Sequence, residues 1–222
     1  NNFKEFNKPI ATYGIKRGTA ELLNKVKDFY YIDHGYFNQS ERTFDSSKTT
    51  VMNLDGYFRI AYNDFFHSGL GNKPADRFEK LKINIKSKRK SGDYIILSPP
   101  GESSEFFKLE NWIERTKEKI KKYSDREIIV HKRGSEIPLE KLFYNAWAFV
   151  TSHSSAGFKA MISGIPSYFT NETLSKIASV EDIEKNEINY KVFNNLAYCQ
   201  WTIKEMESGE AWENITRDIE RN

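Results

Sequence analysis

The segment "VTSHSSAGFKAMISGIPSYF", residues 150–169, joins the end of an apolar strand to a helix through hydroxyl side chains and a histidine. Ser154 and Ser155 stand where that helix would begin, and the unpaired N–H groups and dipole of a helix start favour an anion such as phosphate. Gly157, in the first turn, would let another group approach the backbone. The serines could also serve only as helix caps, because serine is a common N-cap residue.

Two more loops carry groups that suit a phosphate. Each follows an apolar segment of strand length, in "SPPGESSEFF" (98–107) and "HKRGS" (131–135). The residues concerned are Gly101, Ser103, Ser104, His131, Lys132 and Arg133. Each cation alone would suit a surface salt bridge, but their gathering at one edge favours a phosphate-containing ligand. The chain has no GxxxxGK[ST] pattern and no GxGxxG after a strand, so ATPase and dinucleotide-binding functions lack support.

A candidate acid–base group follows another strand, in "YIDHGYF" (31–37). A carboxylate or a histidine there could take the proton of a hydroxyl group, which makes Asp33 and His34 catalytic candidates. Asp33 could equally form a turn with Gly35. Glu21, on the preceding helix, is the second choice for the base.

Basic residues are unevenly distributed, although the net charge is only +3. Lys16 and Arg17 would lie near the acid–base candidates, or would simply be exposed. The runs 80–90 and 117–122 are rich in lysine, and such runs are most often a solvated linker or helix face. They could instead follow the phosphate backbone of duplex DNA. The residues proposed for that contact are Lys86, Lys88, Arg89 and Lys90.

Apolar segments of strand length alternate with amphipathic segments of helix length. We expect strands at 9–14, 29–33, 57–62, 94–98, 127–131, 147–152 and 167–170, and helices at 17–28, 109–124, 138–146 and 155–163. This alternation predicts an α/β fold with parallel sheets, whose ligands bind at the carboxyl ends of the strands. We place a domain boundary between residues 1–90 and 91–222.

Composition sets broader limits. The 222 residues, 38% of them apolar and 14% aromatic, can build a sizeable core. No apolar run approaches the roughly 18 residues of a membrane span, and the polar start "NNFKEFNKPI" lacks the apolar part of a secretory signal, so we expect a cytoplasmic protein. Cys199 is the only cysteine, and the histidines are too scattered to predict a metal site.

The segment "TSHSSAGFKAMISGIPSYF" resembles the serine-pair motif of GT-B-type glycosyltransferases of the bacterial sialyl- and Kdo-transferase kind. The resemblance implies that Ser154 and Ser155 hold the phosphate of the donor nucleotide. Those enzymes carry a basic or His-Pro motif one βα unit earlier, which "VHKRGS" matches loosely, since His131 is present but no proline follows. They usually have an acidic residue where this chain has Lys159, and a lysine there could meet a second phosphate.

Most of the chain also resembles short phage-encoded proteins assigned as glycosyltransferases, in "YGIKRGTAELL", "FYYIDHGYF", "DRFEK", "LSPP", "SDREIIVHKR" and "WTIKEMESGEAW". This resemblance implies two facing Rossmann-like domains with the ligand between them. The N-terminal domain would be abbreviated, and the final helix, from about residue 201, would pack back on it.

The expected function is therefore transfer of a sugar from a nucleotide-sugar co-substrate to a hydroxyl group, by an inverting, metal-independent reaction without a bound cofactor. A phage origin would place the protein in the host cytoplasm and would suit a hydroxymethylated base in duplex DNA as acceptor. A capsule- or lipopolysaccharide-type saccharide is the alternative acceptor. From another class, the protein could be a non-catalytic module that binds nucleotides or nucleic acid.

Overall fold

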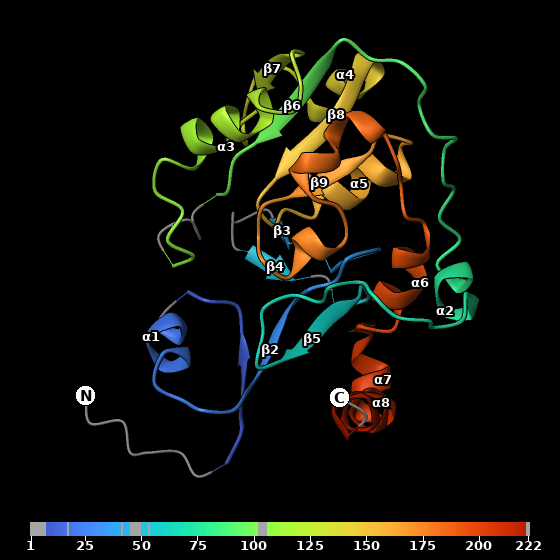
Figure 1. The fold of residues 1–222 in the computed structure, drawn as a ribbon. Coiled ribbons are helices and arrows are strands. Elements are labelled where there is room, and N and C mark those ends of the chain that lie inside the picture. The colour runs from blue at the N-terminus through green and yellow to red at the C-terminus, as the bar shows by residue number, and fades with distance from the viewer. Residues whose placement is uncertain are drawn as a thin grey trace. The chain divides into compact units, whose positions relative to one another are not determined.

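The chain forms an α/β protein of two compact units (Figure 1). The structure is a computed structural model that describes residues 8–16, 18–40, 42–44, 50–52, 54–101 and 106–220. Unit 1 comprises residues 1–67, 73–77 and 194–222, and unit 2 comprises residues 68–72 and 78–193. The division differs from the expected one at residue 90, because 78–90 belong to unit 2 and 194–222 to unit 1.

Unit 1 contains a mixed sheet, in which the strand order is β1-β2-β5-β10. The strands are β1 (Ile10–Tyr13), β2 (Phe29–His34), β5 (Phe58–Tyr62) and β10 (Gln200–Trp201). β1 and β2 are parallel and are joined through α1 (Thr19–Leu23), whereas β5 is antiparallel to both β2 and β10. The expectation of a wholly parallel N-terminal sheet is therefore wrong. The direction of β5 follows from the connection between β2 and β5. A parallel strand would need a crossover connection, whereas this connection contains the antiparallel pair β3 (Arg42–Phe44) and β4 (Thr50–Met52).

The end of the chain completes the core of unit 1. Ile60 of β5, Trp201 of β10 and Ala211 form a buried cluster, and half-buried Tyr30 and Ile32 of β2 pack against it. Ala211 belongs to α8 (Glu210–Glu220), which follows α7 (Ile203–Glu207). Because side chains alternate along a strand, Tyr30 and Ile32 define the face of the sheet that these helices cover.

Unit 2 contains an all-parallel sheet of order β7-β6-β8-β9. The strands are β6 (Tyr94–Ser98), β7 (Glu127–Val130), β8 (Ala146–Thr151) and β9 (Ser167–Phe169). The strands expected at 94–98, 127–131, 147–152 and 167–170 are thus confirmed to within a residue at each end.

The other helical segments in the structure are α2 (Asp76–Lys80), α3 (Trp112–Lys121), α4 (Leu139–Leu142), α5 (Ala156–Ile162) and α6 (Lys191–Ala197), with short 3-10 turns at Phe143–Asn145, Leu174–Lys176 and Val180–Lys185.

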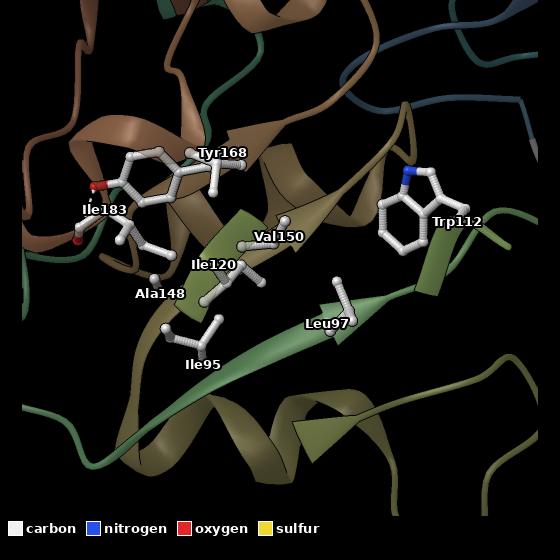
Figure 2. Close-up of a cluster of buried hydrophobic side chains, with 9 residues drawn as sticks. Ile95, Leu97, Trp112, Ile120, Ala148, Val150, Tyr168 and Ile183 are labelled. Atoms are coloured by element: carbon white, nitrogen blue, oxygen red, sulfur yellow. Dashed lines mark hydrogen bonds between the residues drawn. The ribbon is translucent and has the colours of Figure 1, made fainter. Parts of the chain in front are cut away.

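Both faces of this sheet are buried. Ile95 and Val150 point to one face, where they pack with Trp112 and Ile120 of α3 (Figure 2). Ile96 of β6 points to the opposite face, which carries a second cluster: Ile96, Phe143, Ala146, Phe149, Ala160 and Ile165. Figure 2 also shows the hydroxyl of Tyr168 donating to the carbonyl oxygen of Ile183, at 3.3 Å. Two apolar faces explain why β6 and β8 read as continuous apolar runs in the sequence.

No helix in the described part of the chain is long and apolar enough to cross a membrane.

A pair formed by buried Tyr36 and half-buried His67 ties the loop after β2 to the loop after β5. The backbone N–H of His67 donates to the Tyr36 hydroxyl oxygen at 2.9 Å, and that hydroxyl lies 3.0 Å from Nδ1 of His67. The phenolic proton is thus available to Nδ1, which suits a neutral imidazole. Burial, with the nearby Arg59 guanidinium, lowers the pKa of His67 to about 4.

We expect acid to destabilise the protein through His67. The unfolded chain takes up a proton near pH 6.5, while folded His67 resists protonation down to about pH 4, so stability present above pH 6.5 is lost as the pH falls between these values. Allowing for the partial exposure of His67, the loss should be about 2 kcal/mol. Urea unfolding at a series of pH values should give a flatter profile for His67→Gln than for the native protein. The control His131→Gln should keep the native slope, and equal slopes for all three proteins would contradict the assignment.

Candidate functional site

The strand order of unit 2 defines one candidate ligand site. From β6 the chain moves to β7 on one side, and β9 follows β8 on the other, so the order reverses between β6 and β8. In open parallel sheets, ligands bind at the carboxyl ends of the strands at such a reversal. Here those ends are Ser98 and Thr151, which are paired in register. The structure thus brings together the two loops on which the serine-pair segment and "SPPG" lie.

Ser154 and Ser155 have different surroundings at the start of α5. The backbone N–H of Ala156 donates to Oγ of Ser154 at 3.2 Å, and the N–H of Gly157 donates to the carbonyl oxygen of Ser154 at 3.0 Å. Ser155 occupies the N-cap position, but its side chain makes no capping hydrogen bond. The capping alternative therefore describes Ser154, while the Ser155 hydroxyl is the one left for a ligand.

Gly157 is needed for packing within unit 2. A Cβ at this position would lie 2.7 Å from the ring of Phe169, closer than side-chain carbons approach one another. The missing side chain lets α5 pack on β9, so the group that approaches this backbone is an aromatic ring of the protein. The expectation that Gly157 opens the backbone to a ligand is wrong.

His153, which directly precedes the serine pair, was not predicted as a site residue from the sequence. His153 lies against Phe107, with ring centroids 4.6 Å apart, and its Nδ1 is 3.0 Å from Oγ of buried Ser152. Next to it in the fold, Oγ1 of Thr151 is buried without a hydrogen-bond partner. The motif "SHSS" carried the signal, because a histidine there shares the strand end with the serine pair. The edge thus combines aromatic rings with hydroxyl groups, which is a combination found in small-molecule sites.

The other residues predicted to bind the phosphate lie along the same edge of the sheet. β7 neighbours β6, so the loop with Lys132 and Arg133 follows the next carboxyl end, and both side chains are exposed. His131 is engaged within its own loop, since its Nε2 lies 2.9 Å from the carbonyl oxygen of Ile137. Gly101 is exposed, and so is Lys159 on α5. Ser103 and Ser104 lie outside the described residues.

The basic run lies at the opposite edge of this sheet. The N–H of Lys86 donates to Ile162 and that of Arg89 to Gly164, both at 2.8 Å, and these carbonyls close the C-terminal end of α5. The ammonium group of Lys88 donates to the carbonyl of Asn186 at 2.8 Å. Lys90 is exposed, as is Lys86. Since the run precedes the amino end of β6, it lies away from the loops at the carboxyl ends of the strands. It is a largely exposed connection from α2 to β6 that is also held by contacts of Lys86, Lys88 and Arg89.

In unit 1, Asp33 and His34 point to opposite faces of the sheet. Oδ2 of Asp33 accepts from Nη2 of Arg59 and from the Tyr31 hydroxyl, each at 2.9 Å, and Oδ1 accepts the His34 N–H at 2.8 Å. Arg59 also contacts the ring of Phe66, with its guanidinium carbon 5.1 Å from the centroid. Burial and the neighbouring carboxylate raise the pKa of Tyr31. With both oxygens engaged, Asp33 fits a structural ion pair better than a general base.

His34 lies on the face of Tyr30 and Ile32, at the carboxyl end of β2. Its Nδ1 is 2.9 Å from Oγ of Ser40, and its Nε2 is 3.5 Å from the Tyr13 hydroxyl. Glu21 and Lys16 are exposed, on α1 and in the turn that precedes it, and Arg17 lies outside the described residues. Of the acid–base candidates, His34 has a side chain that is held at one ring nitrogen while the other lies near an exposed hydroxyl.

No group of three or more histidine, cysteine, aspartate or glutamate side chains suited to a metal ion occurs within the described residues. Cys199 is half-buried and donates to the carbonyl of Asn195 at 3.4 Å, and burial raises the pKa of its thiol to about 12.

No protein-family model matches this sequence, and comparison with curated proteins gives no significant match. The resemblance to glycosyltransferases therefore stays a prediction that rests on the quoted motifs.

We expect Asp33→Asn to destabilise the protein by about 3 kcal/mol, because the substitution leaves the Arg59 guanidinium largely buried without its counter-charge. Urea unfolding at pH 7 measures the loss, and Glu21→Gln, which changes an exposed carboxylate, should stay within about 0.5 kcal/mol of the native value. Native stability in Asp33→Asn would show that the ion pair is dispensable and would return Asp33 to the catalytic candidates.

Proposed function

We propose that the protein is a glycosyltransferase that moves a sugar from a nucleotide-sugar donor to a hydroxyl acceptor, and that unit 2 binds the donor. The observation that carries the proposal is the reversal of strand order between β6 and β8, at the edge that bears the serine pair. A phosphate at this edge could meet the Ser155 hydroxyl, with the cations Lys132 and Arg133 after the neighbouring strand. The motif resemblance supports a nucleotide sugar over other phosphate-bearing ligands.

The chemistry follows from where charge develops. As the bond from the sugar to the nucleotide phosphate breaks, negative charge grows on the departing phosphate, and fixed donors and cations lower the barrier. Ser155, Lys132, Arg133 and Lys159 are the residues that we assign to this role. The GT-B assignment extends most directly to unit 2, whose parallel sheet suits the nucleotide-binding half, whereas the mixed sheet of unit 1 departs from a Rossmann-like domain.

Among acceptors, a saccharide hydroxyl is favoured over a base in DNA. The DNA hypothesis depended on the basic runs, and in unit 2 the first of them lies at the sheet edge opposite the serine pair. Its Lys88 already donates to a backbone carbonyl, and Lys119 of the second run pairs with Glu181 at 3.2 Å.

The two serines should give separable effects. Ser155→Ala should weaken binding of the preferred nucleotide, out of CMP, UDP and GDP, by about 1–3 kcal/mol, because a hydrogen bond to a charged phosphate is lost. Ser154→Ala should instead lower the free energy of unfolding by about 1 kcal/mol, because a helix cap is lost. Calorimetric titration and urea unfolding measure the two quantities. Unchanged nucleotide affinity in Ser155→Ala would exclude the serine pair as the phosphate site.

The acceptor can be tested through salt. If a saccharide is the acceptor, duplex DNA containing hydroxymethylated bases should bind only weakly. Replacement of Lys86, Lys88, Arg89 and Lys90 by glutamine should then leave the binding curves superimposable between 50 and about 200 mM salt. A steep salt dependence in the native protein, flattened in the variant, would contradict this and restore DNA as the acceptor.

A further inference from the structure

A histidine, a buried serine and an exposed tyrosine meet in unit 1, where the parallel strands β1 and β2 end. Oγ of Ser40 lies 2.9 Å from Nδ1 of His34, and the Tyr13 hydroxyl lies 3.5 Å from Nε2. Ser40 is 2% exposed, whereas Tyr13 is 39% exposed. One ring nitrogen therefore faces the protein interior, and the other faces a group that solvent and ligands can reach.

The loop that carries Ser40 is held by the residues just before β5 and by Gln200 of β10. The N–H groups of Gly35 and Ser40 both donate to the carbonyl of Tyr57, at 2.8 and 3.3 Å. The buried side chain of Gln200 accepts the N–H groups of the two residues after Gly35, at 2.8 and 2.9 Å. A Cβ on Gly56 would lie 2.2 Å from the nitrogen of Ser40, so the two backbones touch. These contacts hold the backbone on which Ser40 stands.

The proton positions follow from the two oxygens. A phenol is a better donor than acceptor, so the Tyr13 hydroxyl is expected to donate to Nε2. Nδ1 then carries the ring proton and donates it to Oγ of Ser40. This tautomer leaves a basic lone pair on Nε2. At 3.5 Å the contact with Tyr13 is at the outer limit of a hydrogen bond, so a substrate hydroxyl at normal distance could replace it.

We propose that His34 is the general base for the acceptor hydroxyl, and that Ser40 is the positioning residue that keeps His34 in the Nδ1–H tautomer. The inference rests on the proposed glycosyl transfer. In that step the acceptor O–H bond breaks, its proton moves to Nε2, and the electron pair of the bond stays on the acceptor oxygen, which becomes the nucleophile. The imidazolium then returns its proton to water.

The surroundings of the ring distinguish this arrangement from a serine–histidine–aspartate triad. Among the described contacts of the His34 ring, the partners are Tyr13 and Ser40. Phe58 is the cross-strand neighbour of His34 on β5, and Asp33 and Arg59 lie on the other face of the sheet. Arg59 reaches His34 only at its backbone carbonyl, at 2.9 Å. A neutral hydroxyl thus takes the orienting place that a carboxylate holds in the triad.

The tautomer can be read directly by nitrogen NMR of the histidine rings in the full chain, with His34→Gln used to assign the signals. We expect the Nδ1–H tautomer for neutral His34 in the native protein. In Ser40→Ala the Nδ1–H group loses its acceptor, and the 3.5 Å contact with Tyr13 is too long to hold the tautomer alone, so the share of the Nε2–H tautomer should rise. Ser40→Thr should restore the native tautomer. An Nε2–H tautomer in the native protein, or a spectrum that Ser40→Ala leaves unchanged, would overturn the role of Ser40.

Activity gives the second readout, as release of nucleotide from CMP-, UDP- and GDP-sugars. His34→Gln should lower kcat by about 100-fold or more and Ser40→Ala by about 10-fold, with KM for the donor nearly unchanged, because the base acts in the chemical step. Ser208→Ala, which alters an exposed serine of the same unit, is the matched control and should keep native turnover.

The two proposals fail in different ways. Native turnover in His34→Gln would overturn the base while leaving glycosyl transfer intact. If the native protein turns over none of these donors, the proposed function fails and the base assignment fails with it, whereas the NMR result still decides whether Ser40 positions His34.

Discussion

The parallel pairing of β6 with β8 is the constraint on which unit 2 depends. Both strands are buried on both faces, so helices must cover the sheet twice, and α3 and α5 do so from opposite sides. Around this sheet, two glycines also let segments of backbone approach each other closely. A Cβ on Gly92 would lie 2.4 Å from the nitrogen of Trp147, and one on Gly164 would lie 2.2 Å from the carbonyl oxygen of Ser87. The same pairing puts the carboxyl ends of the two strands side by side, which is where we propose the phosphate site.

Unit 1 depends on contacts between segments distant in the sequence, because its sheet is mixed and its edge strand β10 lies near residue 200. Arg77 shows how that end is held: its guanidinium donates to Glu205 at 2.8 Å and to the carbonyl of Gln200 at 2.9 Å, and it lies 4.2 Å from the centroid of the Trp201 ring. Gln200 in turn binds the loop after β2. The geometry around His34 therefore depends on residues more than 150 positions away in the sequence.

Side-chain alternation separates two residues that the sequence presents as one motif. Asp33 and His34 are neighbours on β2, and because successive side chains point to opposite faces, one enters the Arg59 ion pair and the other faces Ser40. The Asp33 carboxylate is held by an arginine, whereas the His34 imidazole, held at Nδ1 by Ser40, is the base that we propose. In the same way, Ser154 and Ser155 differ by one position at a helix start, and one caps the helix while the other does not.

The sequence by itself determined where the strands of unit 2 lie, that helices separate them, and that the serine pair begins a helix after a strand. These features are local, because the periodicity of apolar residues and the positions of turn residues predict which segments form strands and helices. Only the tertiary structure decided the antiparallel direction of β5, the Phe169 ring beside Gly157, the carbonyl that holds Lys88 and the hydroxyl that orients His34. Each of these depends on which distant segment packs against the residue. Apolar periodicity predicts that a side chain is buried, but it does not predict which segment packs against it.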